Sequence, residues 1–193
     1  MPTKRSNPAA PFAKARYTLA ATPGTALEAA AHIVEQAGYE PVMLGDALEG
    51  EARDVAAGHA RLALKIQGEG KRAAILSGGE LTVTIKGDGR GGPNQEYALA
   101  LAIELNGASG IHALAADTDG SDGGSGKVDD PAGAFVSPDT LSRAQSLAQN
   151  ARNFLAKNDS TGFFEMLKDL LVTGPTYTNV NDLRVILVAP GER

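Results

Sequence analysis

Three aspartates lie within six residues of one another in a glycine-rich stretch, Asp117–Gly124. The stretch follows an apolar run at 111–116 that predicts a β-strand. The carboxylates of Asp117, Asp119 and Asp122 would repel one another unless a cation or hydrogen-bond donors compensated their charge. The glycines allow the backbone to approach a ligand closely. The stretch therefore predicts a loop that binds a metal ion or a phosphate group, with a solvent-exposed Asp/Gly turn as the alternative.

A second glycine-rich segment, residues 87–92 (GDGRGG), matches the G-x-G-x-x-G pattern of dinucleotide-binding units and precedes a predicted helix. Three features argue against that function. The preceding segment 81–86 alternates apolar and polar residues, Pro93 begins the helix directly after the last glycine, and the Asp88 and Arg90 side chains crowd the pyrophosphate position. We therefore favour a loop whose amides and Arg90 bind an anion beside the helix N-terminus. A glycine-rich connector with a solvated arginine is the alternative.

Hydroxyl and amide side chains are dense in residues 173–182 (TGPTYTNVND), just before a predicted strand. Such neutral groups suit recognition of hydroxyl, carboxylate or phosphate oxygens. A long turn whose side chains cap their own backbone fits equally well. The three histidines are scattered along the chain and predict no metal site or catalytic triad.

Hydrophobic periodicity predicts an α/β protein in which helices cover a sheet. We expect strands at 17–21, 39–44, 73–76, 81–86, 111–116 and 183–188, with a further short strand at 132–136. We expect helices at 22–37, 49–66, 93–105, 138–156 and 161–170, the first with a capping box formed by Thr25 and Glu28. Ser77–Glu80 predicts a tight β-hairpin turn, so the sheet should be mixed but mostly parallel, with about six strands.

The composition suits one soluble domain over 17–193, preceded by a tail or interdomain linker at 1–16. A net charge of −5 argues against a general nucleic-acid binder and against binding to an anionic membrane surface. The chain has no cysteine and therefore no disulfide or thiolate metal site. No membrane span or signal peptide is predicted, so we expect a cytoplasmic location.

Four motifs occur in register along the chain: SGGELTVT at 77–84, GRGGPNQE at 89–96, DTDGSDG at 117–123 and TGPTYTNVND at 173–182. In this order they resemble the C-terminal (MOFRL) domain of class II glycerate kinases, many of which are labelled hydroxypyruvate reductases. The resemblance covers about residues 17–188, and four motifs in order are far more specific than any one of them.

The resemblance implies a three-layer α/β/α domain and transfer of the γ-phosphoryl group of ATP to a hydroxyl of glycerate, with Mg²⁺. The implied partners are a nucleotide and a three-carbon hydroxy acid, and NAD(P)H is not expected as a cofactor. The implied catalytic residues are Asp119, Asp122 and Arg90, and the implied metal ligands are Asp117, Asp119 and Asp122. The implied substrate- and phosphate-binding residues are Gly78, Gly79, Glu80, Gly89, Gly91, Asn94, Gln95, Glu96, Thr176, Asn179 and Asn181.

Members of this family carry a larger N-terminal domain, and their active site lies in the cleft between the two domains. That domain is absent from these 193 residues, so we expect the chain to fold but to have little or no kinase activity. Two other functions stay open: an NAD(P)H-dependent hydroxypyruvate reductase fragment, and a non-catalytic ligand-binding or assembly module. The sequence does not decide whether the domain forms a homodimer.

Overall fold

The computed structural model describes residues 16, 18 and 20–191. Its helices are α1 (Pro23–Gln36), α2 (Ala52–Gly68), α3 (Pro93–Leu105), α4 (Thr140–Ser146), α5 (Ala151–Ala156) and α6 (Ser160–Leu167). Its strands are β1 (Glu40–Met43), β2 (Ala73–Gly78), β3 (Ile111–Asp117), β4 (Gly133–Val136), β5 (Leu170–Leu171) and β6 (Asp182–Val188). Among these residues no helix is long and apolar enough to cross a membrane.

The six strands form one sheet in the order β1-β2-β6-β3-β4-β5. The mixed α/β sheet is confirmed, but the expectation of mostly parallel strands is wrong. Among the described strands, β1 and β2 are the one parallel pair. Strand β6 enters between β2 and β3 and runs antiparallel to both, and β4 and β5 continue the antiparallel pattern. Strand β6 thus starts at the end of the sheet where β2 and β3 finish, which brings loops that are distant in sequence close together.

The predicted hairpin after β2 does not form, and residues 81–86 are not a strand. Gly79 turns the chain away with φ +91°, and Thr82 forms only an isolated bridge with Glu51. The Glu51 carboxylate then accepts the Thr84 backbone N–H at 3.1 Å. A β-carbon at position 79 would lie 2.2 Å from the Leu48 nitrogen, so the glycine is needed for close packing as well as for its φ angle.

The remaining differences lie at element ends. Residues 18, 20 and 21 of the predicted first strand have no regular structure, and positions 17 and 19 lie outside the described residues. The cap of α1 is Thr22, which exchanges hydrogen bonds with Thr25, so the predicted capping box was placed one turn too late. The predicted helix at 138–156 is divided into α4 and α5 at Ala148, which has φ +56°. The short strand β5 was not predicted.

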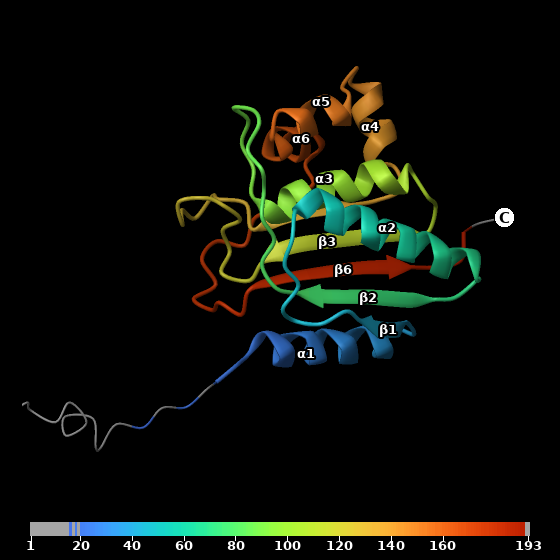
Figure 1. Cartoon of the computed structure of the whole chain (residues 1–193), viewed down its shortest axis with the longest axis vertical. Coiled ribbons are helices and arrows are strands. Elements are labelled where there is room, and N and C mark those ends of the chain that lie inside the picture. The colour runs from blue at the N-terminus through green and yellow to red at the C-terminus, as the bar shows by residue number, and fades with distance from the viewer. Residues whose placement is uncertain (1–15, 17, 19, 192–193) are drawn as a thin grey trace, which may run out of the picture.

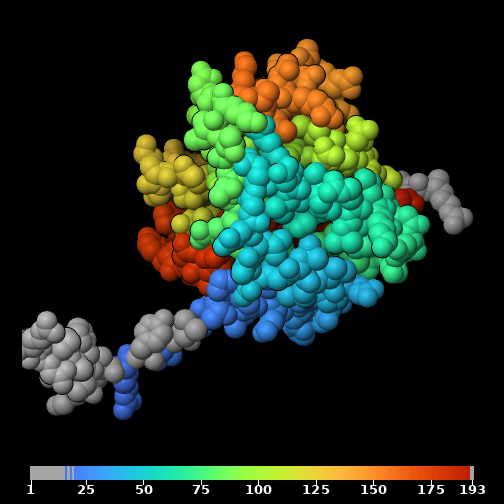
Figure 2. Space-filling view, viewed as in Figure 1, coloured from blue at the N-terminus to red at the C-terminus, as the bar shows by residue number. Residues whose placement is uncertain are grey.

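Helices α2 to α6 lie on one side of the sheet and α1 lies on the other, at the β1 edge (Figure 1). Helix α3 is buried along nearly its whole length between the sheet and the other helices, as expected of a helix that is apolar on all sides. In Figure 2 the residues of α2 lie across the middle of the visible face, and those of α4 to α6, in orange, lie above them in the view. The rigid layer around α3 fixes the position of the helix's N-terminus, where three of the four motifs meet.

Candidate functional site

The four motif loops converge at one end of the sheet, the left end in Figure 1. Strands β2 and β3 finish there, β6 begins there, and α3 begins above them. The convergence follows from the antiparallel insertion of β6, which pairs Asp182 with Asp117 and Leu183 with Gly78. A buried polar network then joins the loops.

Arg184 is the centre of this network, with only 1% of its surface exposed. Its guanidinium donates to the carbonyls of Gly78 and Gly79 at 2.7 Å each, and to Asp182 Oδ2 at 3.0 Å. Buried guanidinium groups require such partners, because an unpaired charge is very costly in the interior. Sequence reasoning missed Arg184. The available signal was an arginine at a core-facing position of the apolar alternation in β6, where every second residue is buried.

Asn94 carries the network from β6 to the acidic loop. Its Nδ2 donates to Asp182 Oδ1 at 2.8 Å and to Asp122 Oδ1 at 3.2 Å. Arg184 binds the 77–84 motif through the carbonyls of Gly78 and Gly79. Asn94 belongs to the 89–96 motif, Asp122 to the 117–123 motif and Asp182 to the 173–182 motif. One chain of hydrogen bonds therefore connects all four motifs.

Asp122 caps the N-terminus of α3 from outside the helix. Its two carboxylate oxygens accept the backbone N–H groups of Asn94 (3.0 Å) and Gln95 (2.8 Å) as well as both side-chain amides. Burial raises the pKa of Asp122, and these four donors offset part of that effect. Both oxygens therefore already accept hydrogen bonds within the protein.

Asp117 and Asp119 are less buried and closer to solvent. Burial, with repulsion from Asp119 and Asp182, raises the pKa of Asp117 to about 6, although its Oδ1 accepts the Asp119 N–H at 2.9 Å. Asp119 Oδ1 accepts the Ser121 N–H at 2.8 Å, and no hydrogen bond to Asp119 Oδ2 is recorded among the described residues.

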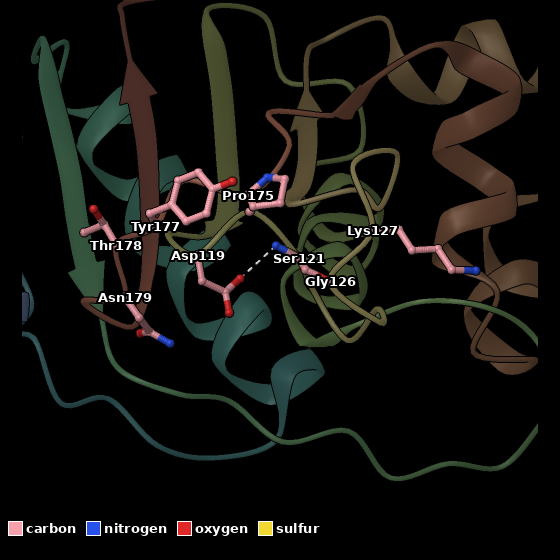
Figure 3. A pocket seen from close by; sticks show the side chains of 9 residues that line it. Asp119, Ser121, Gly126, Lys127, Pro175, Tyr177, Thr178 and Asn179 are labelled. Atoms are coloured by element: carbon pink, nitrogen blue, oxygen red, sulfur yellow. Dashed lines mark hydrogen bonds between the residues drawn. The ribbon is translucent and has the colours of Figure 1, made fainter.

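Asp119 faces a cavity of about 350 Å³ formed by the acidic loop and the 175–179 segment (Figure 3). Asn179 and Thr178 line the opposite side, and Pro175 and Tyr177 form its apolar wall. Lys127 also lines the cavity, but its side chain extends away from Asp119 (Figure 3). Thr176 is exposed and is not among the residues that line this cavity. Its N–H donates to the Asp119 carbonyl at 3.0 Å and its hydroxyl donates to the Thr118 carbonyl, which holds the two loops together.

Arg90 lies in a neighbouring hollow, shared with Gly89, Gly91, Gln95 and Asp122. Its guanidinium pairs with Glu165 at 2.6 Å, and both side chains are more than half exposed. The glycines of this loop pack against the start of α6: a β-carbon at position 91 would lie 2.1 Å from Ser160 Oγ. The segment before the loop is not a strand, so the strand-loop-helix unit of a dinucleotide site is absent here.

The predicted residues at the start of α3 separate into two groups. Gln95 lines the Arg90 hollow, and its Oε1 accepts from Thr161 at 2.7 Å. Glu96 points elsewhere: it is 2% exposed and pairs with Arg53 at 2.7 Å. Asn158 donates to the same carboxylate at 3.1 Å, so Glu96 anchors the α5–α6 connection to α3 and lines none of these hollows.

A third hollow lies beside β2 and is bordered by Gly79, Glu80 and Asn181. Asp46 and Glu49 give it two further carboxylates. Gly78 is buried and does not line this hollow, and its carbonyl accepts from Arg184 and from the Leu48 N–H. The predicted residues that line a hollow are thus distributed over three hollows at one end of the sheet, whereas Gly78, Asn94, Glu96, Asp117 and Thr176 line none of them.

Within the described part of the chain, no group of three or more His, Asp or Glu side chains could enclose a metal ion. Asp119, with Asp117 beside it, is the remaining candidate ligand. Such an arrangement fits Mg²⁺ that binds together with phosphate, because Mg²⁺ commonly takes only one or two carboxylates along with water and phosphate oxygens.

Comparison with known proteins agrees with this arrangement of motifs. Residues 73–182, more than half of the chain, match the sequence profile of the MOFRL family. The chain belongs to the MOFRL family. A protein of Agrobacterium vitis named "Putative hydroxypyruvate reductase" is 50% identical over 88% of this chain. A D-glycerate 2-kinase of Thermotoga maritima is 35% identical over 81% of it.

The crystal structure of a Thermotoga maritima glycerate kinase has the same fold, with a TM-score of 0.84 at 32% identity over 90% of this chain. The α/β architecture predicted from the sequence is therefore confirmed. This MOFRL chain is shorter than its relatives: it covers 39% of the Agrobacterium protein, 37% of the Thermotoga kinase and 42% of the crystallised chain.

Proposed function

We propose that this chain supplies the MOFRL half of an ATP-dependent glycerate kinase site. The observation that carries the proposal is the buried network from Gly78 through Arg184, Asp182 and Asn94 to Asp122. It fixes four loops around one end of the sheet and leaves the carboxylate of Asp119 directed into a cavity. Phosphoryl transfer depends mainly on positioning and charge neutralisation, which such a framework provides.

Asp119 would hold Mg²⁺ together with phosphate oxygens, and the ion would neutralise the charge of the transferred group. Asn179, across the same cavity, would donate to a phosphate or hydroxyl oxygen. Asn181 and Glu80 border the neighbouring hollow and would contact the hydroxy acid. These assignments are supported by position and donor chemistry alone.

Arg90 would neutralise phosphate charge by exchanging its partner. Its ion pair with Glu165 is exposed, and exposed pairs contribute roughly 0–1 kcal/mol. An incoming phosphate offers a bidentate, doubly charged alternative and would displace the glutamate readily. The Gly89 and Arg90 N–H groups already donate to the Lys157 carbonyl and to Asp159, so Arg90 would act through its guanidinium.

Activity should require a second protein segment, because all three hollows are open and water would compete for the transferred group. We propose that the remainder of the longer relatives supplies the opposite wall, so the 193-residue chain alone should be nearly inactive. Because the reaction consumes ATP, we expect it to take place in the cytoplasm.

Coupled detection of ADP release, with glycerate and Mg²⁺, tests the proposal. The chain alone should give no release above background. In the Thermotoga D-glycerate 2-kinase, asparagine at the position that aligns with Asp119 should lower kcat at least about 100-fold. Robust turnover by the chain alone would contradict the need for a second segment, and full activity of the asparagine variant would contradict the role of Asp119.

The name of the Agrobacterium relative supports a second candidate, reduction of hydroxypyruvate. Titration of the chain with NADH, followed by nicotinamide fluorescence, distinguishes it from the kinase. We expect no saturable change, since the glycine loop packs against α6 and the α3 N-terminus is already capped by Asp122. Saturable enhancement of fluorescence would favour the reductase.

A further inference from the structure

Among the described residues, helices cover only part of one face of the sheet. Within the described residues, α1 is the only helix in the apolar cluster on this face, and it packs on β1 and β2. The other five helices cover the opposite face. The same separation is visible in Figure 1, where α1 lies at the β1 edge, away from the others.

One row of the uncovered part is apolar across three strands, although the exposed His112 lies on the same face of β3, opposite Leu187. Strand register places Leu76, Val185, Leu114 and Phe135 side by side in one row across β2, β6, β3 and β4. Leu76 lies under α1 and is fully buried, Val185 and Leu114 are partly exposed, and Phe135 is 45% exposed. We call this face of β6, β3 and β4 the open strip; Leu183 and Leu187 extend it along β6.

Helix α1 presents a matching flank to the open strip. Ala26, Ala30 and Ile33 lie at i, i+4 and i+7 on one stripe of the helix, and Ile33 is 65% exposed. A parallel strand-helix-strand crossover such as β1-α2-β2 is right-handed in nearly all proteins, and α1 lies on the other face, so we expect this stripe to turn toward β6. The other flank, which carries Glu28 and Glu35, turns outward.

The dimensions of the strip fit a single helix. Strands about 4.8 Å apart make three strands about 10 Å wide, which is the diameter of an α-helix with its side chains. Strand β6 has seven residues, a length of about 23 Å that a helix of about 15 residues would span. Helix α1, with 14 residues, covers the adjacent two strands in the same manner.

We propose that the open strip binds an amphipathic helix from the part of the longer family proteins that this chain does not span. The chain covers only 39% of its Agrobacterium relative, so ample sequence exists to supply it. The helix would lie beside α1, with its apolar face on Val185, Leu114 and Phe135 and one edge on Ile33. This surface is on the face of the sheet and is independent of the kinase cavity.

A thiol reporter tests the proposal, since the natural chain has no cysteine. Phe135→Cys places a single thiol in the open strip, and Leu147→Cys places one at a residue of similar exposure, 51%, at the end of α4. The probe is the remainder of the Agrobacterium relative, expressed separately and added in excess. The rate of reaction with a chromogenic disulfide is then measured.

We expect the thiol at position 135 to react at least tenfold more slowly when the remainder is present, and the thiol at 147 to react at an unchanged rate. Ile33→Glu should weaken association at least tenfold while leaving the melting temperature of the isolated chain within a few degrees. Association that leaves the reaction at 135 unchanged, or a lack of association, would overturn the proposal. So would protection of position 135 in the chain alone that increases with its concentration, because the occupant would then be a second copy.

Discussion

At the scale of single residues, the three aspartates of the acidic loop have different environments although the sequence presents them as equivalents. Asp122 is 4% exposed and caps α3, Asp117 is partly buried against Asp182, and Asp119 lines the cavity formed with the 175–179 segment. Their spacing predicted that an acidic loop follows β3. Which carboxylate would be buried depends on where α3 lies, and that contact crosses 28 positions of sequence.

Asp122→Asn should destabilise the protein by about 2–4 kcal/mol. An amide has one acceptor oxygen where the carboxylate has two, and its NH₂ group would face the N–H donors of Asn94 and Gln95. Asp119→Asn should cost less than about 1 kcal/mol, since its oxygen still accepts from Ser121. Urea denaturation of both variants measures the difference. Equal losses would contradict the assignment of Asp122 as the cap.

Asp117 should give the stability of the protein a specific pH dependence. Its pKa is raised to about 6 in the folded chain from 3.8, so protonation favours folding. The contribution is complete below about pH 3.8 and is lost as the pH rises through about 6. Asp117→Asn removes this loss.

The stability of Asp117→Asn relative to the natural chain should therefore increase between pH 4 and 7.5, by an amount on the order of 1 kcal/mol once solvent screening is allowed for. Asp129→Asn, at an exposed position of the same loop, is the matched control and should show no such trend. Urea midpoints at several pH values provide the measurement. A flat difference for Asp117→Asn would show that its carboxylate titrates normally.

At the scale of elements, helices were easier to predict from the sequence than strand partners. The patterns for α1, α2 and α3 located real helices, because 3.6-residue periodicity and caps are local signals. The alternating residues 81–86 wrongly predicted a strand, because period-2 alternation does not specify the strand with which a segment would pair. In this segment Thr82 forms a single isolated β-bridge, with Glu51. Arg184 was missed for a related reason: its partners at Gly78 and Gly79 are over 100 positions away.

Gly79, which directly follows β2, is the junction residue whose substitution should lower the stability of the protein most. Gly79→Ala adds a β-carbon 2.2 Å from the Leu48 nitrogen at φ +91°, so we expect a loss of about 3 kcal/mol or more. Gly126→Ala has a similar φ of +77° but no atom within 4 Å, and should cost only about 1 kcal/mol. Thermal or urea unfolding compares the two. A similar cost for both would mean that the 46–48 segment does not pack against the end of β2.

At the scale of the whole molecule, the fold places the four motif loops at one end of the sheet, where β2 and β3 finish and β6 begins. Membership of the MOFRL family and the shared glycerate kinase fold are established by comparison, and the order of the four motifs was sufficient to anticipate both. The sequence could not reveal that the motifs would be joined through buried polar side chains, or that the hollows would stay separate. Both depend on the insertion of β6 between β2 and β3.

The central claim is that Asp119 and the 175–179 segment receive a magnesium-bound phosphate. Titration of the isotope-labelled chain with ADP and Mg²⁺, followed by amide NMR shifts, tests it most directly. We predict saturable shifts at Gly120, Ser121 and Asn179 that require Mg²⁺ and disappear in Asp119→Asn, while the matched variant Asp129→Asn retains them. Shifts confined to other parts of the chain, or shifts that persist unchanged in Asp119→Asn, would contradict the account.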